Sequence, residues 1–429
     1  MEEFKLDNKE HIDQISVASA TGDDHRTGSS FGAYFNIVCA IAGSGILGLP
    51  AAVAKGGWIM LGFFGLVAVV SIFTGRLLVE CLYYKPGERL QELPDIGEAA
   101  FGKLGRYFTK FFHYTISLSG ATIYILLTGT SIFKVLNDYG GVQPLAVRTW
   151  IMIAGMIVVV PFSLLKSMKE VALLSVLGVL ATVVVVFVVV IWGGINYDPS
   201  TVQNDTFVFE NLPSALATIA FSYGGNVVYP HVEGSMRHPR SWNRVLTFAI
   251  MSITAMYIIT GLCGYLYYGR GVSSPILESL PTGTATLIGY VAITAHVLLA
   301  TPIYLCSFAL EQENFLKIDR KYMSKWREFG LRVALRCTIC ASVTVVAMFV
   351  PYFSELMALV GALANCMIVF LLPVAFHYRL YGVKNRPLSQ NITAGLVVLL
   401  GLFGLCAGTF FASRDLITAI ETGKSSASH

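Results

Sequence analysis

The chain has 429 residues, of which 55% are hydrophobic and only 13% are charged, with a formal net charge of +4. A soluble domain with this composition and a mean hydropathy of +0.66 would expose large apolar patches to water, so a soluble fold is excluded. The composition therefore predicts a polytopic membrane protein, and no nucleic-acid partner is expected.

Apolar runs of about 20 residues predict about eleven membrane-spanning helices. In chain order they are expected near residues 31–54, 57–82, 108–136, 148–165, 170–195, 211–234, 243–268, 283–310, 332–350, 355–379 and 391–411. Segment 1–30 is polar and lacks the features of a signal peptide, so a disordered cytoplasmic tail is expected there. One membrane domain would span 31–414, with a short C-terminal tail at 415–429.

The distribution of basic residues predicts the orientation of the chain. With the N-terminus in the cytoplasm and every helix reversing the side, most of the 30 Lys and Arg residues face the cytoplasm, and Arg76 lies within a span. The outer loops receive only Lys55, Lys134, Arg148, Arg270, Arg414 and Lys424. This bias predicts a cytoplasmic N-terminus and a C-terminus that is outside or lumenal. The glycosylation sequon Asn204-Asp205-Thr206 falls in a loop that this topology also places outside.

The longest cytoplasmic loop, from Glu311 to Arg332, mixes acidic and basic residues around Trp326 and Phe329. Two alternatives fit this pattern. The loop is expected to be either an amphipathic helix lying on the membrane or a solvated linker.

Two of the predicted spans contain residues that interrupt a helix. The first span carries the segment Gly43–Pro50, which contains three glycines and ends in proline. The sixth carries the segment Phe221–Asn226, which is followed by Pro230. A broken helix survives in hydrocarbon only where protein or water satisfies its backbone groups. Matched breaks in two halves of a membrane protein indicate a substrate site near the midplane.

An odd helix count fits two inverted repeats of five helices plus one extra helix, because an odd number of spans reverses the second unit. Residues 31–195 would form the first repeat, 211–379 the second, and 391–411 the extra helix. The broken helices would then be helices 1 and 6, the first of each repeat. The predicted fold class is therefore an all-α membrane protein with a 5+5 inverted repeat.

The glycines of the first break allow two other interpretations. The spacing Gly43-x-Gly45-x-x-Gly48 formally matches a dinucleotide-binding fingerprint, but no strand precedes it and no acidic residue follows about twenty residues later. Small residues can also serve only to let helices approach closely. Pro50 and the second break favour a substrate site over both.

The two breaks offer complementary groups for a zwitterionic amino acid. Free N–H groups at the start of a half-helix can bind a carboxylate, and unwound carbonyls can receive an ammonium group. A pocket lined by Ile46, Phe221 and Tyr223 would favour neutral substrates. The predicted substrate-binding residues are Ala42, Gly43, Ser44, Gly45, Ile46, Phe221, Ser222, Tyr223, Gly224 and Gly225.

The segment from Phe35 to Pro50 resembles the first helix of the amino acid/auxin permease family. The residues from Ala220 through Pro230, and the Met-Arg-His-Pro run that ends at Pro239, are similar to that family's sixth helix and its exit. The similarity in pattern extends from residue 31 to residue 411. It implies an eleven-helix, LeuT-like fold and secondary active transport of amino acids.

The resemblance also bears on the coupling ion. In sodium-coupled branches of the family, an Asn that ligates the ion occupies the position of Cys39 in this chain. A thiol is a poor ligand for a hard cation, so protons are expected to drive transport rather than sodium. The proton-coupling candidates are His296 and Glu233, because ionisable groups within a membrane are functional candidates. For Glu233 the alternative is a structural i,i+4 pair with Arg237.

The predicted function is therefore a proton-coupled amino acid transporter that works by alternating access. The alternatives are a membrane-embedded amino acid sensor and a sodium-coupled symporter. An enzyme is not expected, since the sequence contains no HExxH run, no GxSxG elbow and no paired catalytic acids in a span. No metal and no cofactor is expected, and the partners would be the amino acid, protons and the lipid bilayer. The family includes vacuolar and plasma-membrane members, so the sequence does not decide between the vacuolar and the plasma membrane.

Overall fold

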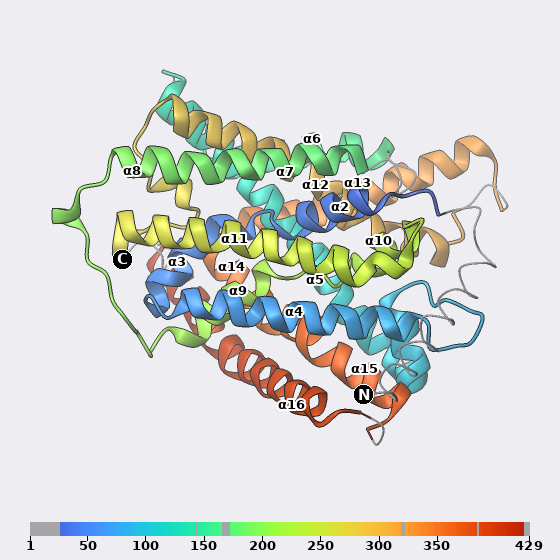
Figure 1. Ribbon diagram of the computed structural model, residues 1–429. Coiled ribbons are helices and arrows are strands. Elements are labelled where there is room, and N and C mark those ends of the chain that lie inside the picture. The colour runs from blue at the N-terminus through green and yellow to red at the C-terminus, as the bar shows by residue number, and fades with distance from the viewer. Residues whose placement is uncertain (1–25, 142–144, 165–171, 319–321, 384–385, 424–429) are drawn as a thin grey trace.

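The computed structural model describes residues 26–423, except for 142–144, 165–171, 319–321 and 384–385. Apart from connecting loops and two isolated β-bridges, the described residues are helical. Figure 1 shows the longer helices running side by side in one bundle, with the loops at its two ends. Eight helices in the described part are long and apolar enough to cross a membrane, or nine if the bent pair α2–α3 is one span. The expected all-α membrane protein is confirmed.

The helix bounds follow the predicted spans closely. The α-helices are α2 (Ser30–Ile41), α3 (Gly45–Gly56), α4 (Met60–Leu82), α5 (Leu93–Tyr139), α6 (Val147–Leu164), α7 (Ala172–Phe187), α8 (Gly193–Ile195), α9 (Leu212–Ser222), α10 (Tyr229–Ser235), α11 (Trp242–Tyr268), α12 (Thr284–Phe315), α13 (Lys325–Phe349), α14 (Phe353–Val360), α15 (Leu372–Tyr381), α16 (Leu388–Phe403) and α17 (Thr409–Thr422). The π-helical segments η3 (Val188–Trp192), η8 (Gly361–Leu371) and η9 (Gly404–Gly408) continue α7, α14 and α16. Every predicted range contains helix. However, the apolar helices Val147–Ser163 in α6 and Leu212–Ser222 (α9) are shorter than the eighteen residues required of a span, so the count of eleven spans stays a prediction.

Two connections differ from the expectation. Helix α5 begins at Leu93, well before the expected start, because Glu92 and Asp95 form a capping box, and Gly102 (φ 68°) then bends the helix. The loop from Glu311 to Arg332 is largely taken up by the end of α12 and the start of α13, and residues 319–321 lie outside the described residues. Both helices therefore continue beyond their apolar runs, and the two alternatives for this loop stay predictions.

The first span is broken where the sequence predicts, but over a shorter stretch. Helices α2 and α3 are bent by 51° to each other, and only the three residues from Ala42 to Ser44 separate them. Pro50 lies inside α3 and does not interrupt it. A proline removes one backbone donor, and neighbouring groups in a membrane protein can satisfy the carbonyl that is freed. The prediction that Pro50 contributes to the break was therefore wrong.

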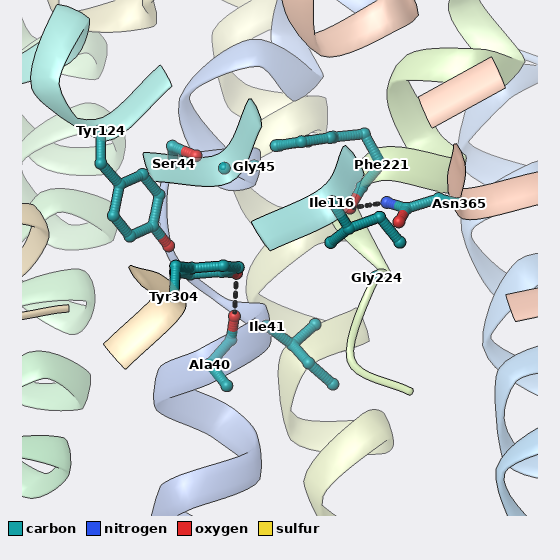
Figure 2. Close-up of a pocket in the computed structure, with 11 residues that line it drawn as sticks. Ala40, Ile41, Ser44, Gly45, Ile116, Tyr124, Phe221, Gly224, Tyr304 and Asn365 are labelled. Atoms are coloured by element: carbon teal, nitrogen blue, oxygen red, sulfur yellow. Dashed lines mark hydrogen bonds between the residues drawn. The ribbon is translucent and has the colours of Figure 1, made fainter. Parts of the chain in front are cut away.

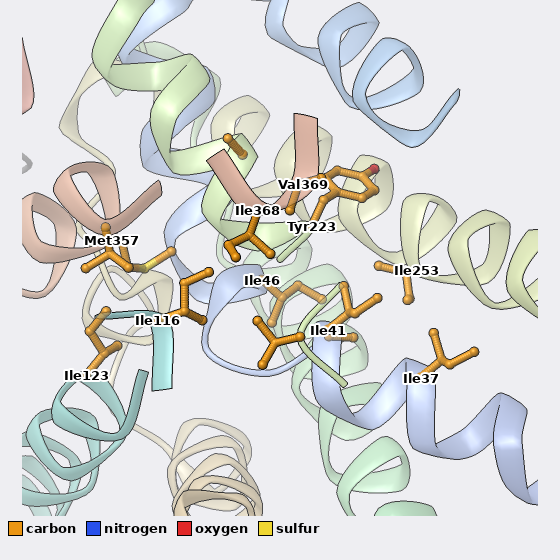
Figure 3. Close-up of a cluster of buried hydrophobic side chains, with 14 of the residues drawn as sticks. Ile37, Ile41, Ile46, Ile116, Ile123, Tyr223, Ile253, Met357, Ile368 and Val369 are labelled. Carbon is orange, nitrogen blue, oxygen red and sulfur yellow. The ribbon is translucent and has the colours of Figure 1, made fainter. Parts of the chain in front are cut away.

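The sixth span is broken over a longer stretch. Helix α9 ends at Ser222 and α10 begins at Tyr229, with Pro230 in the first turn of α10, where a proline fits. The two breaks lie within the core of the bundle, because α3 packs against α9 and α11, and α2 packs against α7 and α11. Figure 3 shows Ile41 and Ile46, on either side of the first break, among buried side chains of other helices.

Candidate functional site

A small cavity lies between the two breaks (Figure 2). About 20 Å³ is open to the centre of a water molecule, which is room for about one water. An amino acid is larger, so side chains must move before one can bind. The cavity is lined by Ala40, Ile41, Ser44, Gly45, Ile116, Gly120, Tyr124, Phe221, Gly224, Tyr304 and Asn365.

Four of the predicted substrate-binding residues line this cavity. They are Ser44 and Gly45 at the start of α3, and Phe221 and Gly224 around the end of α9. The break residues of helices that are far apart in the sequence thus meet around one space. This arrangement puts the free N–H end of α3 opposite the carbonyl end of α9.

The other predicted residues surround the cavity without lining it. The Ala42 carbonyl accepts a hydrogen bond from Thr182 Oγ1 at 2.9 Å. The buried Tyr223 hydroxyl lies 3.1 Å from the Phe64 carbonyl and 3.0 Å from Thr254 Oγ1. The remaining four, Gly43, Ile46, Ser222 and Gly225, are buried in the packing around the breaks.

Gly45 lies in close contact with the second break. A Cβ atom added to Gly45 would lie 2.9 Å from Ser222 Oγ and 3.0 Å from Ser222 Cα, closer than side chains tolerate. The glycine therefore allows α3 to approach α9, as small residues do at helix interfaces. Since Gly45 also lines the cavity, close packing and a substrate site are not exclusive here.

Tyr257 of α11 connects the two breaks. Its hydroxyl oxygen lies 2.9 Å from the Ile41 carbonyl and 2.7 Å from the Ser222 carbonyl, which are the last residues of α2 and α9. The side chain is fully buried. One hydroxyl proton is thus shared between two helix C-termini, whose carbonyls carry partial negative charge.

We expect the substitution Tyr257→Phe to raise the KM for a transported amino acid about fivefold. The phenyl ring keeps the packing, but the lost hydrogen bond, worth about 1 kcal/mol, no longer holds the two carbonyls together. Initial uptake rates in proteoliposomes over a range of substrate concentrations measure the change. The control is Tyr265→Phe, because the Tyr265 hydroxyl contacts Asp205 in a loop and not the cavity. An unchanged KM for Tyr257→Phe would contradict this prediction.

The cavity also contains residues that the sequence reasoning missed. Ile116, Gly120 and Tyr124 come from α5, and Tyr304 comes from α12, where its hydroxyl donates to the Ala40 carbonyl at 3.2 Å. Aromatic and small residues are common in membrane spans, so no local signal identifies them. Asn365 is different, because a polar side chain in an apolar run is itself a signal, and from the sequence a substrate role for it is an alternative to the favoured hydrogen bond between helices.

His296 lies beside the first break. Its Nδ1 atom lies 2.9 Å from the Gly178 carbonyl and donates to it, which leaves Nε2 as an acceptor in the neutral ring. Nε2 is buried and has no hydrogen-bond partner among the residues that the structure describes. A Cβ atom on Gly43 would lie 3.2 Å from Nε2. The ring also contacts the ring of Tyr124 edge-on, with centroids 6.4 Å apart. His296 therefore packs against a residue of the cavity wall without lining the cavity itself.

Glu233 is buried at the opposite end of the bundle from the tip of α3. Its carboxylate lies 2.7 Å from Arg89 Nη2 and 3.7 Å from Arg26 Nη1, and it accepts a hydrogen bond from the Tyr83 hydroxyl. The alternative pair with Arg237 does not form, because α10 ends at Ser235. Glu233 thus connects α10 to the segment before α2 and to the segment after α4.

One family model and three relatives connect this chain to known proteins. The family model described as transmembrane amino acid transporter protein matches residues 26–413. Amino acid transporter AVT1J of Arabidopsis thaliana is 28% identical over 395 residues, which cover 89% of this chain and 90% of the relative. Amino acid transporter AVT1E of the same plant is 26% identical over 400 residues, covering 89% of this chain and 72% of the relative. The vesicular GABA transporter of Caenorhabditis elegans is 26% identical over 419 residues, covering 92% and 82%.

Proposed function

Because the chain belongs to the transmembrane amino acid transporter family, we propose that it moves neutral amino acids across a membrane by secondary active transport. The family match confirms the resemblance of the first and sixth helices, and it confirms that the chain is not an enzyme, since its relatives are transporters. The observation that carries the proposal is the cavity between the two helix breaks. Among the residues that the structure describes, its lining contains no ionisable acid or base apart from tyrosine, so a substrate with a charged side chain would meet no counter-charge there.

The helix ends define where the main-chain groups of an amino acid would bind. Ser44 and Gly45 present the N-terminus of the twelve-residue helix α3 to the cavity, which suits a carboxylate. The carbonyls of Ile41, which lines the cavity, and of Ser222, which is buried beside it, accept hydrogen bonds from the same Tyr257 hydroxyl, and after the cavity opens they would suit an ammonium group. The other predicted residues, Ala42, Gly43, Ile46, Tyr223 and Gly225, would support these two subsites.

The proposed architecture is the eleven-span, LeuT-like bundle with a 5+5 inverted repeat. The broken pairs α2–α3 and α9–α10 would begin the two repeats, and α16–α17 would form the extra helix. Their contact at the cavity supports this arrangement, because alternating access needs a site between two units that can rock against each other. The closed cavity then corresponds to a state that must open before the substrate enters.

The proposed driving ion is the proton, with His296 as its carrier. A buried imidazole whose Nε2 has no partner among the described residues can take up a proton, and its contacts with Gly43 and Tyr124 would transmit the change to the first break. Glu233 is the second candidate. Its contacts with two arginines support a role in closing the cytoplasmic end, since they hold α10 against the segments before α2 and after α4.

Uptake into proteoliposomes under an imposed pH or sodium gradient, with a panel of labelled amino acids, tests the proposal. We expect a pH gradient to drive uptake of neutral amino acids and a sodium gradient alone to drive none. His296→Gln should abolish gradient-driven uptake but keep counterflow of labelled substrate, because the glutamine amide cannot titrate. Uptake driven by sodium alone would contradict proton coupling. Absence of counterflow in the unaltered protein would favour the sensor.

The proposed orientation has a cytoplasmic N-terminus and an outer or lumenal C-terminus, in either the vacuolar or the plasma membrane. Asn204 is exposed in the loop before α9, on the side that this orientation places outside. A glycan on Asn204 in a eukaryotic host, removed by Asn204→Gln, would support the orientation, and an unmodified Asn204 would count against it.

A further inference from the structure

Asn365 is a polar residue in the wall of the cavity for which the transport scheme above has no use. It lies in the π-helical segment η8 between α14 and α15, and its side chain is only 2% exposed. Its Nδ2 atom donates to the Phe221 carbonyl at 3.1 Å, and the Ala220 carbonyl lies 3.4 Å from the same nitrogen. Figure 2 shows this amide on the side of the cavity opposite Tyr124.

The orientation of the amide follows from its partners. Carbonyl oxygens only accept hydrogen bonds, so the amide nitrogen must face Phe221 and Ala220, and the amide oxygen must face the other way. That oxygen, Asn365 Oδ1, is buried and has no hydrogen-bond partner in the part of the chain that the structure describes. A buried acceptor without a donor is unfavourable, and such groups are rare in folded proteins. A bound molecule with a hydrogen-bond donor would satisfy it.

The substrate's main-chain groups have other partners. In the proposed function, the carboxylate would face the N-terminus of α3 at Gly45, and the ammonium group would face the carbonyls of Ile41 and Ser222. Asn365 contacts the residue before Ser222, so it lies beside the ammonium subsite, where the substrate's side chain leaves the main chain. The rest of this wall is apolar or aromatic, including Ile116 and the ring of Phe221.

We propose that Asn365 Oδ1 accepts a hydrogen bond from the side chain of the transported amino acid. Asn365 thereby selects small neutral amino acids that carry a hydroxyl or amide donor over hydrocarbon side chains of the same shape. This inference rests on the proposed transport function and adds the substrate class to it. The physical basis is that a hydrocarbon side chain would exclude water from Oδ1 without replacing its hydrogen bond.

Isosteric substrate pairs test the inference directly. Uptake of threonine is compared with that of valine, and uptake of serine with that of 2-aminobutyrate, since each pair exchanges a hydroxyl for a methyl group. We expect kcat/KM in the unaltered protein to be about tenfold higher for the hydroxyl member of each pair. Asn365→Leu should bring both ratios close to one, because it removes the acceptor at similar volume. Asn365→Ala provides the same readout should the leucine variant fail to fold.

Asn226 offers a matched control. It is also fully buried, donates from Nδ2 to the Ile368 carbonyl at 3.2 Å, and has an Oδ1 atom without a partner among the described residues. It does not line the cavity. Asn226→Leu protein that transports should therefore keep the preference for threonine over valine.

Three results would overturn the inference. Equal kcat/KM for threonine and valine in the unaltered protein would show that Oδ1 does not accept a hydrogen bond from the substrate's side chain. A ratio that Asn365→Leu and Asn365→Ala leave unchanged would show the same. A loss that is equal for all four substrates, with the ratios kept, would assign Oδ1 to the ammonium group instead. Failure to exchange any amino acid would overturn the proposed function itself, whereas exchange without discrimination overturns only this inference.

Discussion

Replacing Gly45 by leucine is expected to abolish amino acid uptake while leaving the protein folded in the membrane. The new side chain would begin 3.0 Å from Ser222 Cα, a backbone atom that cannot rotate away, and would extend into a cavity with room for about one water. It would force α3 and α9 apart and block the site at the same time. Because displacements of about 1 Å in a functional site cost about 100-fold in rate, we expect a loss of at least that size.

The measurement is the initial uptake rate in proteoliposomes, divided by the amount of reconstituted protein and accompanied by size-exclusion chromatography. Gly395→Leu is the matched control, because a Cβ atom added to Gly395 on α16 would meet nothing within 4 Å. Gly45→Ala should fall between the two. Normal substrate affinity and transport by Gly45→Leu protein would show that the first break is not part of the site.

The second large effect is expected for Glu233→Leu. The substitution removes the carboxylate that pairs with Arg89 and Arg26 and leaves two largely buried guanidinium groups without their partner. Breaking a buried ion pair by removing one member costs about 3–5 kcal/mol. We expect the melting temperature to fall by about 5 °C, and uptake to fall because, in the proposed scheme, Glu233 helps to close this end of the bundle. The exposed pair of Lys85 and Glu88 is the control, since Glu88→Leu should change the melting temperature by less than about 1 °C.

Glu233→Gln separates the two roles considered for this residue. The amide oxygen can still accept from Tyr83, but the side chain can no longer carry a proton. If Glu233 only helps to close its end of the bundle, the variant keeps a dependence of uptake on the pH gradient. Loss of that dependence with counterflow retained would make Glu233 the proton carrier in place of His296. The double variant Glu233→Leu/Arg89→Leu should recover part of the lost stability, because it removes one of the unpaired charges.

Much of the fold could be predicted because membrane spans leave a local record in the sequence. The bilayer thickness determines the length of an apolar run, so ranges such as 57–82 and 243–268 nearly coincide with α4 and α11. How far a helix continues beyond the hydrocarbon is harder to predict from the sequence. The early start of α5 at Leu93 depends on the capping pair of Glu92 and Asp95, which the hydropathy pattern does not show.

The candidate site was only partly accessible from the sequence. Gly45 and Gly224 could be identified because glycine in an apolar run marks a backbone that leaves the helix or approaches another one. Tyr124 and Tyr304 could not, because they come from intact helices and owe their position to packing against the first break. For Pro50 the local pattern predicted a helix break that the structure does not have, because the proline is accommodated within α3.

The sequence by itself determined that this protein is a helical membrane protein and where its two spans break, because apolar run length and backbone chemistry are local properties. Only the tertiary structure decided which groups the breaks bring together. Tyr257 joins the ends of α2 and α9, and Asn365 of η8, in the wall of the cavity between them, donates to the Phe221 carbonyl. Two of these contacts, Tyr257 with Ile41 and Asn365 with Phe221, join residues more than a hundred positions apart. They are created by packing between helices, which no local sequence pattern records.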